Sequence, residues 1–89
     1  MQSQSAKPEI HVGEMVRKVF EAKPRCFTVV RLARMLNCDR SNVYDIFNRA
    51  SMDTSMLLRL SVALRHDFFA EISGEINRKK LLGRAPEEL

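Results

Sequence analysis

The sequence predicts an all-α fold, a compact bundle of four to five short helices. Apolar residues recur three and four positions apart in successive segments, which is the spacing of one face of a helix. A polar capping residue, flanked by two apolar residues at the positions of a hydrophobic staple, occurs at three points along the chain. The β-branched run Thr28-Val29-Val30 is the main strand signal, and helical spacing follows it at once.

The length and composition are typical of one small globular domain. Of the 89 residues, 45% are hydrophobic and 29% are charged, which excludes a fully disordered chain. No apolar run approaches the roughly 20 residues of a membrane span. The first residues lack the apolar region of a signal peptide, so we expect a cytoplasmic location. The net charge of +4 permits an anionic partner, and the small core argues against a large enzyme.

The sequence contains no motif typical of catalysis, metal binding or cofactor binding. Cys26 and Cys38 do not form a CxxC pair, and His11 and His66 stand far apart, so no zinc-ligand spacing results. A Gly-rich phosphate loop, a nucleophile elbow and an acid pair are also missing. We therefore expect no enzyme, no metal, no cofactor and no small-molecule ligand.

The chain begins with a polar segment and a first helix. Residues 1–9 lack periodicity, and we interpret them as a flexible N-terminal arm. An apolar stripe predicts a helix from about Val12 to Ala22, and Pro24 ends it because the residue before a proline is disfavoured in the helical region. The cations around this helix are interpreted as ordinary surface, with phosphate contacts as the alternative: Arg17, Lys18, Lys23 and Arg25.

A second helix is expected to follow Thr28, which is a good N-cap because its hydroxyl can accept a bond from a first-turn amide. Phe27 and Leu32 occupy the staple positions on either side of this cap. The helix stops at Asn37, a residue that tolerates positive φ better than most.

The same device predicts a third helix, from about Arg40 to Asn48. Asp39 is the expected N-cap, and its carboxylate also complements the helix dipole. Cys38 and Val43 form the staple pair. The inward stripe of this helix consists of Val43, Ile46 and Phe47.

Asp53 is the expected cap of a fourth, leucine-rich helix that ends near Arg65. A short fifth helix follows Asp67 and carries Phe68, Phe69 and Ile72. Residues 10–73 therefore make the predicted domain. The remaining segment, 74–89, is interpreted as a mobile C-terminal tail, with one amphipathic turn as the alternative.

The second and third helices, with the tight turn between them, carry the functional signal. Ala33 is small where two crossing helices approach closely, Asn37 suits left-handed turn geometry, and Cys38 fills the angle between the helices. These requirements predict a helix-turn-helix, in which the second helix enters the major groove of DNA.

The chain resembles the Cro and lambda-repressor-like helix-turn-helix proteins, the XRE-type transcriptional regulators, over about Ile10 to Ser73. The resemblance implies a bundle of four or five helices that docks its third helix in the major groove. The matching residues are Thr28, Leu32, Ala33, Leu36, Asn37, Cys38, Asp39, Arg40, Ser41, Val43, Ile46, Asn48, Leu57, Leu58, Arg59 and Leu60.

The sequence departs from the family pattern at three positions. Val29 stands where many members have a glutamine that touches the DNA backbone. Asn37 and Arg49 replace two common turn glycines, and Arg49 implies a different loop after the recognition helix.

The outward face of the third helix supplies the candidate base contacts. Arg40 can bind guanine or phosphate, and Ser41 can bond to bases or phosphate. Asn42, at the edge of this face, can read adenine or bond to the backbone. Tyr44 can stack on sugar or pack against a thymine methyl group.

Four further residues complete the predicted DNA-binding site. Asn48 and Arg49 are placed for phosphate contacts, and Thr28 is one of the residues that match the family. Asp45 can accept from cytosine N4 or pair with Arg49 at the i+4 spacing, and we interpret it as structural or orienting.

The sequence thus predicts a sequence-specific double-stranded DNA-binding protein, a small transcriptional regulator. A homodimer on half-sites about one helical turn apart is expected, with a contact through the segment from Phe68 onwards. The Phe68-Phe69 pair is either core or part of that dimer surface. The alternative function is a protein-interaction adaptor, antitoxin-like or a degenerate helix-turn-helix, which Val29, Asp45 and the modest charge favour.

Overall fold

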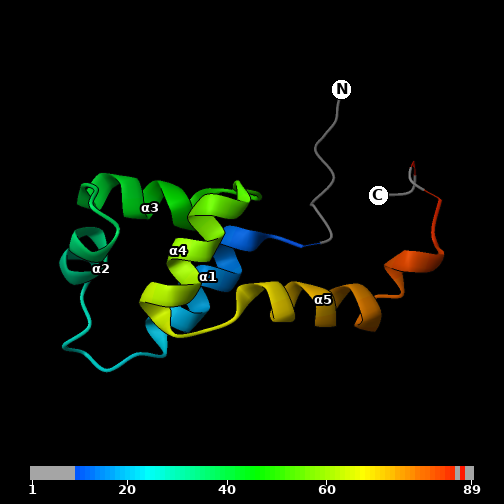
Figure 1. Ribbon diagram of the computed structural model, residues 1–89, viewed down its shortest axis with the longest axis horizontal. Coiled ribbons are helices and arrows are strands. Elements are labelled where there is room, and N and C mark those ends of the chain that lie inside the picture. Colours follow the sequence, from blue (N-terminus) through cyan, green and yellow to red (C-terminus); the bar gives the residue numbers. More distant parts are fainter. Residues whose placement is uncertain (1–9, 86, 88–89) are drawn as a thin grey trace.

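The computed structural model describes residues 10–85 and 87, and this part of the chain is all-α, with no strand (Figure 1). The predicted fold class is therefore confirmed, whereas the expected arm, residues 1–9, lies outside the described residues. The elements are α1 (Val12–Glu21), α2 (Val29–Met35), α3 (Arg40–Asn48), α4 (Thr54–Leu64), α5 (Phe68–Arg78) and a final 3-10 turn, η1 (Leu81–Gly83).

Side-chain caps start most of the helices, and the sequence predicts two of them, Thr28 and Asp53. The oxygens of Thr28, Asp53 and Asp67 accept from the amide three residues on, at 3.1, 2.7 and 3.0 Å. Asp39 precedes α3, but its side chain forms no cap hydrogen bond, so that expected bond is wrong. Its backbone carbonyl accepts instead from Asn42 N, the amide that a capping carboxylate would bind.

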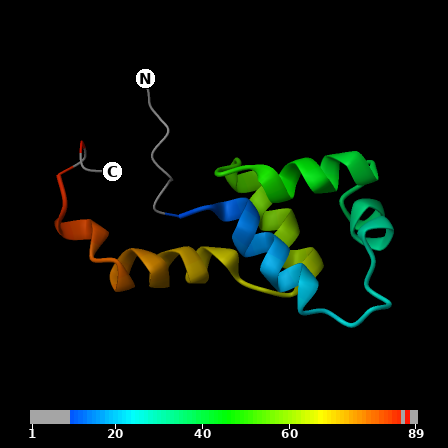
Figure 2. The ribbon, with the colours of Figure 1, turned by 180° about the vertical axis from the view of Figure 1, so that it is seen from behind.

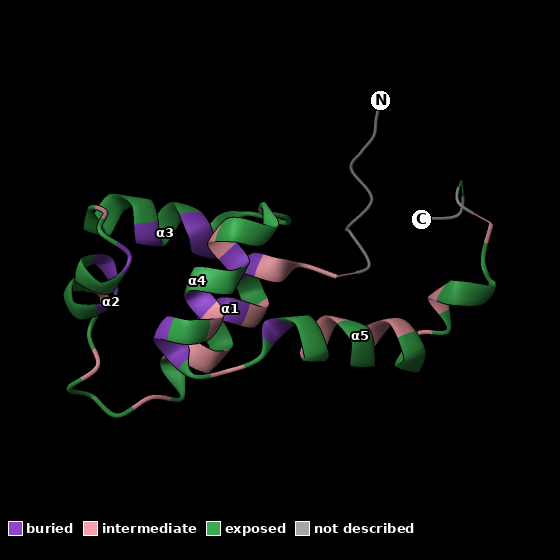
Figure 3. Ribbon diagram, in the orientation of Figure 1, coloured by how far each residue is buried: buried purple, intermediate pink, exposed green. Residues whose placement is uncertain are grey.

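The core lies where α1 to α4 meet the start of α5 (Figure 3). Phe68 belongs to this core and is fully buried, whereas the next residue, Phe69, is exposed. Phe68 is therefore core, whereas Phe69 is available to a surface contact. The buried apolar side chains are Val16, Leu32, Ala33, Leu36, Val43, Ile46, Phe47, Leu57, Leu60, Ala63, Leu64 and Phe68.

Helix α5 is longer than the sequence suggested, because it passes through Gly74 and ends at Arg78. The start of the segment interpreted as a tail is therefore helical. Ion pairs one turn apart support this end of the helix: Glu75 contacts Arg78 at 2.5 Å and Lys79 at 4.0 Å. The hydrogen bonds from Arg78 hold the pKa of the Glu75 carboxyl below its ordinary value.

Backbone contacts join the first turn of α1 to the end of α3, which lie against each other in Figure 2. Gly13 N donates to Arg49 O at 2.8 Å, and Val12 N donates to Ala50 O at 3.0 Å. The approach is so close that a Cβ on Gly13 would lie 2.4 to 2.5 Å from three backbone carbonyl oxygens of residues 46, 47 and 49. Only glycine fits there without a shift of the backbone.

Replacing Gly13 by alanine is expected to destabilise the fold by about 2–3 kcal/mol, because two packed backbones must separate. Gly74→Ala is the matched control, since nothing lies within 4 Å of a Cβ at that exposed helical position. That change should stabilise the protein by about 0.5–1 kcal/mol. Urea unfolding of both variants measures the two effects, and equal stabilities would contradict the close approach at Gly13.

Candidate nucleic-acid interface

The turn between α2 and α3 has the geometry that the sequence predicts. Asn37 lies in the left-handed region with a φ of 57°. Its amide donates to Arg34 O at 3.1 Å, and the amide of Cys38 donates to Ala33 O at 2.9 Å. This pair of bonds is the Schellman motif, which satisfies the last carbonyls of α2 and reverses the chain into α3.

A long-range contact holds the same turn against α4. The guanidinium of Arg59 donates to the carbonyl oxygen of Leu36, the residue that caps the C-terminus of α2. A cation at this end of a helix also complements its dipole. The sequence offered no signal for this role, because Arg59 is an exposed residue on a leucine-rich helix and its partner is distant in the chain.

Helix α3 divides into two faces. Val43, Ile46 and Phe47 are buried, as expected. All eight residues of the predicted DNA-binding site are exposed: Thr28, Arg40, Ser41, Asn42, Tyr44, Asp45, Asn48 and Arg49. The structure thus places seven of them on or directly after α3, and Thr28 before α2.

Most of the polar side chains on this face have no partner within the described part of the chain. The ion pair between Asp45 and Arg49, one of the two alternatives for Asp45, is not formed, so Arg49 does not neutralise the Asp45 carboxylate. The hydroxyl of Thr28 is engaged, because it accepts the capping bond from Arg31 N. The face therefore presents donors and acceptors that are free to bind an external partner.

An open groove of ≈ 1110 Å³ lies between α2 and α3. It joins Arg40 to Arg34, a second guanidinium that was not among the predicted site residues. Helical spacing could have identified Arg34 as a neighbour of this groove. Arg34 directly follows Ala33, which faces inward, so its side chain lies beside the buried face of α2. The lining consists of Val30, Ala33 and Arg34 from α2, Asn37, Cys38 and Asp39 from the turn, and Arg40, Ser41 and Tyr44 from α3.

A smaller depression on the other side of α3 adds a cation from α1. Arg17 shares this depression with Tyr44 and Asn48. The sequence favours ordinary surface over a phosphate contact for Arg17, whereas the fold brings it beside the exposed face of α3. Arginine side chains thus stand on both sides of Tyr44.

The chemistry of this surface is that of hydrogen bonding and charge. Within residues 10–85 and 87, no three His, Cys, Asp or Glu side chains gather as a metal-ligand set. Cys26 and Cys38 are both free thiols.

None of the helices that the structure describes is long and apolar enough to cross a membrane.

A second exposed surface, the α4–α5 patch, consists of Leu58, Val62 and Phe69. Val62 is 71% exposed, and the three apolar side chains line one shallow hollow. Such a cluster of large apolar side chains on a small domain is typical of an interaction site.

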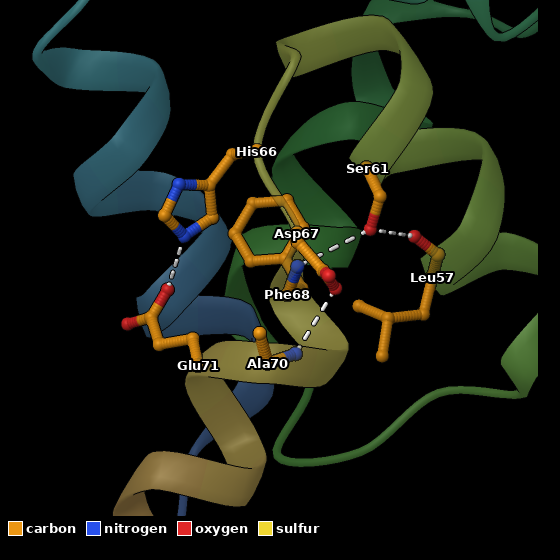
Figure 4. A network of polar contacts seen from close by, with 7 residues as sticks. All are labelled: Leu57, Ser61, His66, Asp67, Phe68, Ala70 and Glu71. Carbon is orange, nitrogen blue, oxygen red and sulfur yellow. Dashed lines mark hydrogen bonds and ion pairs between the residues drawn. The ribbon is translucent and has the colours of Figure 1, made fainter.

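Polar contacts fix the angle between α4 and α5 beside this patch (Figure 4). The hydroxyl of Ser61 donates to Leu57 O at 2.9 Å and accepts from Phe68 N at 3.4 Å. His66 Nε2 lies 2.6 Å from Glu71 Oε1, and the His66 ring packs edge-on against Phe68. The patch is therefore held in one shape across two helices.

Comparison of the chain with known protein families, with curated proteins and with solved structures found no match.

Proposed function

We propose that the protein binds double-stranded DNA sequence-specifically through α3 in the major groove, as a small helix-turn-helix regulator of transcription. The observation that carries this proposal is the exposed face of α3, whose polar side chains are unengaged and whose flanks carry arginines from two other helices. An α-helix fits the width of the major groove, and unpaired donors and acceptors are what base edges require.

The residues divide by chemistry into two groups. Arg40, Ser41, Asn42 and Tyr44 are proposed to contact base edges, since they lie on the first half of α3. Arg49 and Asn48, at its end, are proposed to contact phosphates, together with Arg17 and Arg34. Asp45 remains a candidate acceptor for cytosine N4.

We also propose a homodimer through the α4–α5 patch, which refines the expected contact from Phe68 onwards. One module reads few base pairs, and a two-fold dimer doubles the site. The three patch side chains are apolar, so two copies of the patch can meet across a two-fold axis without bringing like charges of these residues together. The proposal includes a cytoplasmic location. It includes no enzymatic activity.

The second candidate function is a protein-interaction adaptor that keeps the bundle and does not bind DNA strongly. The exposed α4–α5 patch favours it, because that surface suits a foreign protein as well as a second copy. The two functions differ in their response to DNA.

Anisotropy of a labelled random duplex, titrated at several salt concentrations, tests the proposed function. Three arginine–phosphate contacts per copy, from Arg17, Arg34 and Arg49, predict that log K falls with log salt at a slope of about −3 for each copy bound. A weak response without salt dependence would favour the adaptor.

Arg40→Ala is expected to cost about 1–3 kcal/mol of binding at the preferred site, selected from a random pool, and to relax specificity at one position. Arg49→Ala is the matched control. It should weaken binding on all sequences alike and lower the salt slope by about one. A uniform loss for Arg40→Ala would reassign that side chain to phosphate.

Val62→Glu is expected to make the protein monomeric, because a two-fold contact would bring two carboxylates together in an apolar interface. Leu82→Glu is the control, since Leu82 is 81% exposed on η1 and outside the patch. Sedimentation equilibrium measures both variants. A monomeric parent protein, or a dimer broken only by Leu82→Glu, would contradict the proposed interface.

A further inference from the structure

The end of α5 and the turn after it, η1, project away from the helical core. Figure 1 shows η1 at the opposite end of the molecule from α2 and α3, along its longest dimension of 42 Å. Within the described residues, Ile72 is the last one that packs against the core. Beyond it, Leu82 is 81% exposed, more than any other large apolar side chain in the described part of the chain. No element of the fold covers this leucine.

The segment around Leu82 is strongly basic. Residues 76–86 include no acidic residue and four basic ones, which are Arg78, Lys79, Lys80 and Arg84. The Lys80 side chain is exposed and forms no hydrogen bond or ion pair within residues 10–85 and 87. Lys80 and Arg84 are each two positions from Leu82, so their Cα atoms lie within ~8 Å of its own. The exposed leucine therefore has a cation on either side of it in the chain.

The backbone holds this arrangement in place. Lys80 lies in the left-handed region with a φ of 56°, and its amide donates to Asn77 O at 3.2 Å. The amide of Arg84 donates to Leu81 O at 3.1 Å and closes η1. The turn packs against the end of α5, and of its two leucines Leu81 is half-buried whereas Leu82 is exposed. The apolar side chain is thus presented by a folded turn.

Charge and apolar exposure together indicate the partner. The phosphate backbone of a nucleic acid binds cations and offers no apolar site for Leu82. The surface of an anionic bilayer suits both features, because its headgroups attract lysine and arginine and its acyl boundary accepts apolar side chains. We propose that the α5–η1 tip, residues 78–84, docks peripherally on a bilayer that contains anionic phospholipids, with Leu82 inserted and Lys80 among the headgroups.

The position of the α5–η1 tip separates it from the candidate DNA-binding face. Because the two surfaces lie at opposite ends of the molecule, a copy docked on a bilayer leaves α3 uncovered (Figure 1). The inference does not depend on the proposed DNA binding, and it adds a second surface with a different class of partner.

Co-sedimentation of the full chain with lipid vesicles tests the proposal. We expect binding to vesicles of equal parts phosphatidylcholine and phosphatidylglycerol, and at least tenfold weaker binding to pure phosphatidylcholine. Each basic residue near an anionic bilayer contributes a factor of about five. Added salt should weaken the binding, since it screens these charges. Equal binding to both kinds of vesicle, or binding to neither, would overturn the proposal.

Variants link vesicle binding to the tip. Lys80→Gln should lower the partition coefficient about fivefold, and Leu82→Gln about fivefold to tenfold, because a charge or a buried apolar side chain is lost. Arg25→Gln and Met35→Gln are the matched controls, since Arg25 is exposed between α1 and α2 and Met35 is 49% exposed on α2. The controls should leave the partition coefficient nearly unchanged, and thermal unfolding checks that each variant keeps the fold.

The remaining outcomes distinguish this inference from its alternatives. Losses in the controls as large as those at the tip would assign the binding to net charge and overturn the proposal. The proposal is also wrong if Lys80→Gln weakens binding to a labelled duplex and leaves vesicle binding intact, because the partner of the tip is then a nucleic acid. Vesicle binding is measured without DNA, so a failure of the proposed function would leave this result unaffected.

Discussion

The docking of the first turn of α1 on the end of α3 sets the position of the whole candidate interface. Two amides of α1, on Val12 and Gly13, donate to carbonyls directly after α3. These amides and carbonyls would otherwise need water or side-chain partners, because helix ends leave them unsatisfied. The positive end of one helix dipole also meets the negative end of another. The absence of a side chain on Gly13 makes this contact possible.

The other end of α3 is fixed by different means. The Schellman turn at Asn37 determines how the chain leaves α2, and Arg59 binds the last carbonyl of α2 from α4. Between these two anchors, Val43, Ile46 and Phe47 pack into the core. Helix α3 is therefore held at both ends and along one face, so its outward side chains project from a rigid support. Rigid placement lowers the conformational cost of binding.

Local features of this fold could be predicted from the sequence, and contacts between distant residues could not. The caps Thr28 and Asp53, and the turn at Asn37, depend on neighbours within a few positions, and they are confirmed. Gly13 and Arg59 act on partners that only the folded chain brings near, and no local pattern marks them. The inward and outward faces of α3 followed from helical periodicity, whereas Arg17 joined the candidate site through packing of α1.

The unengaged side chains on α3 have a consequence for how this protein can change over time. Because the side chains of Arg40, Ser41, Asn42 and Asp45 form no hydrogen bond or ion pair within the described part of the chain, their replacement removes no such contact from the fold. If α3 binds DNA as proposed, mutations there would alter the sequence that is bound while the stability of the bundle changes little. Under the proposed function, duplicated copies of the gene could thus diverge in recognition one residue at a time on the same scaffold.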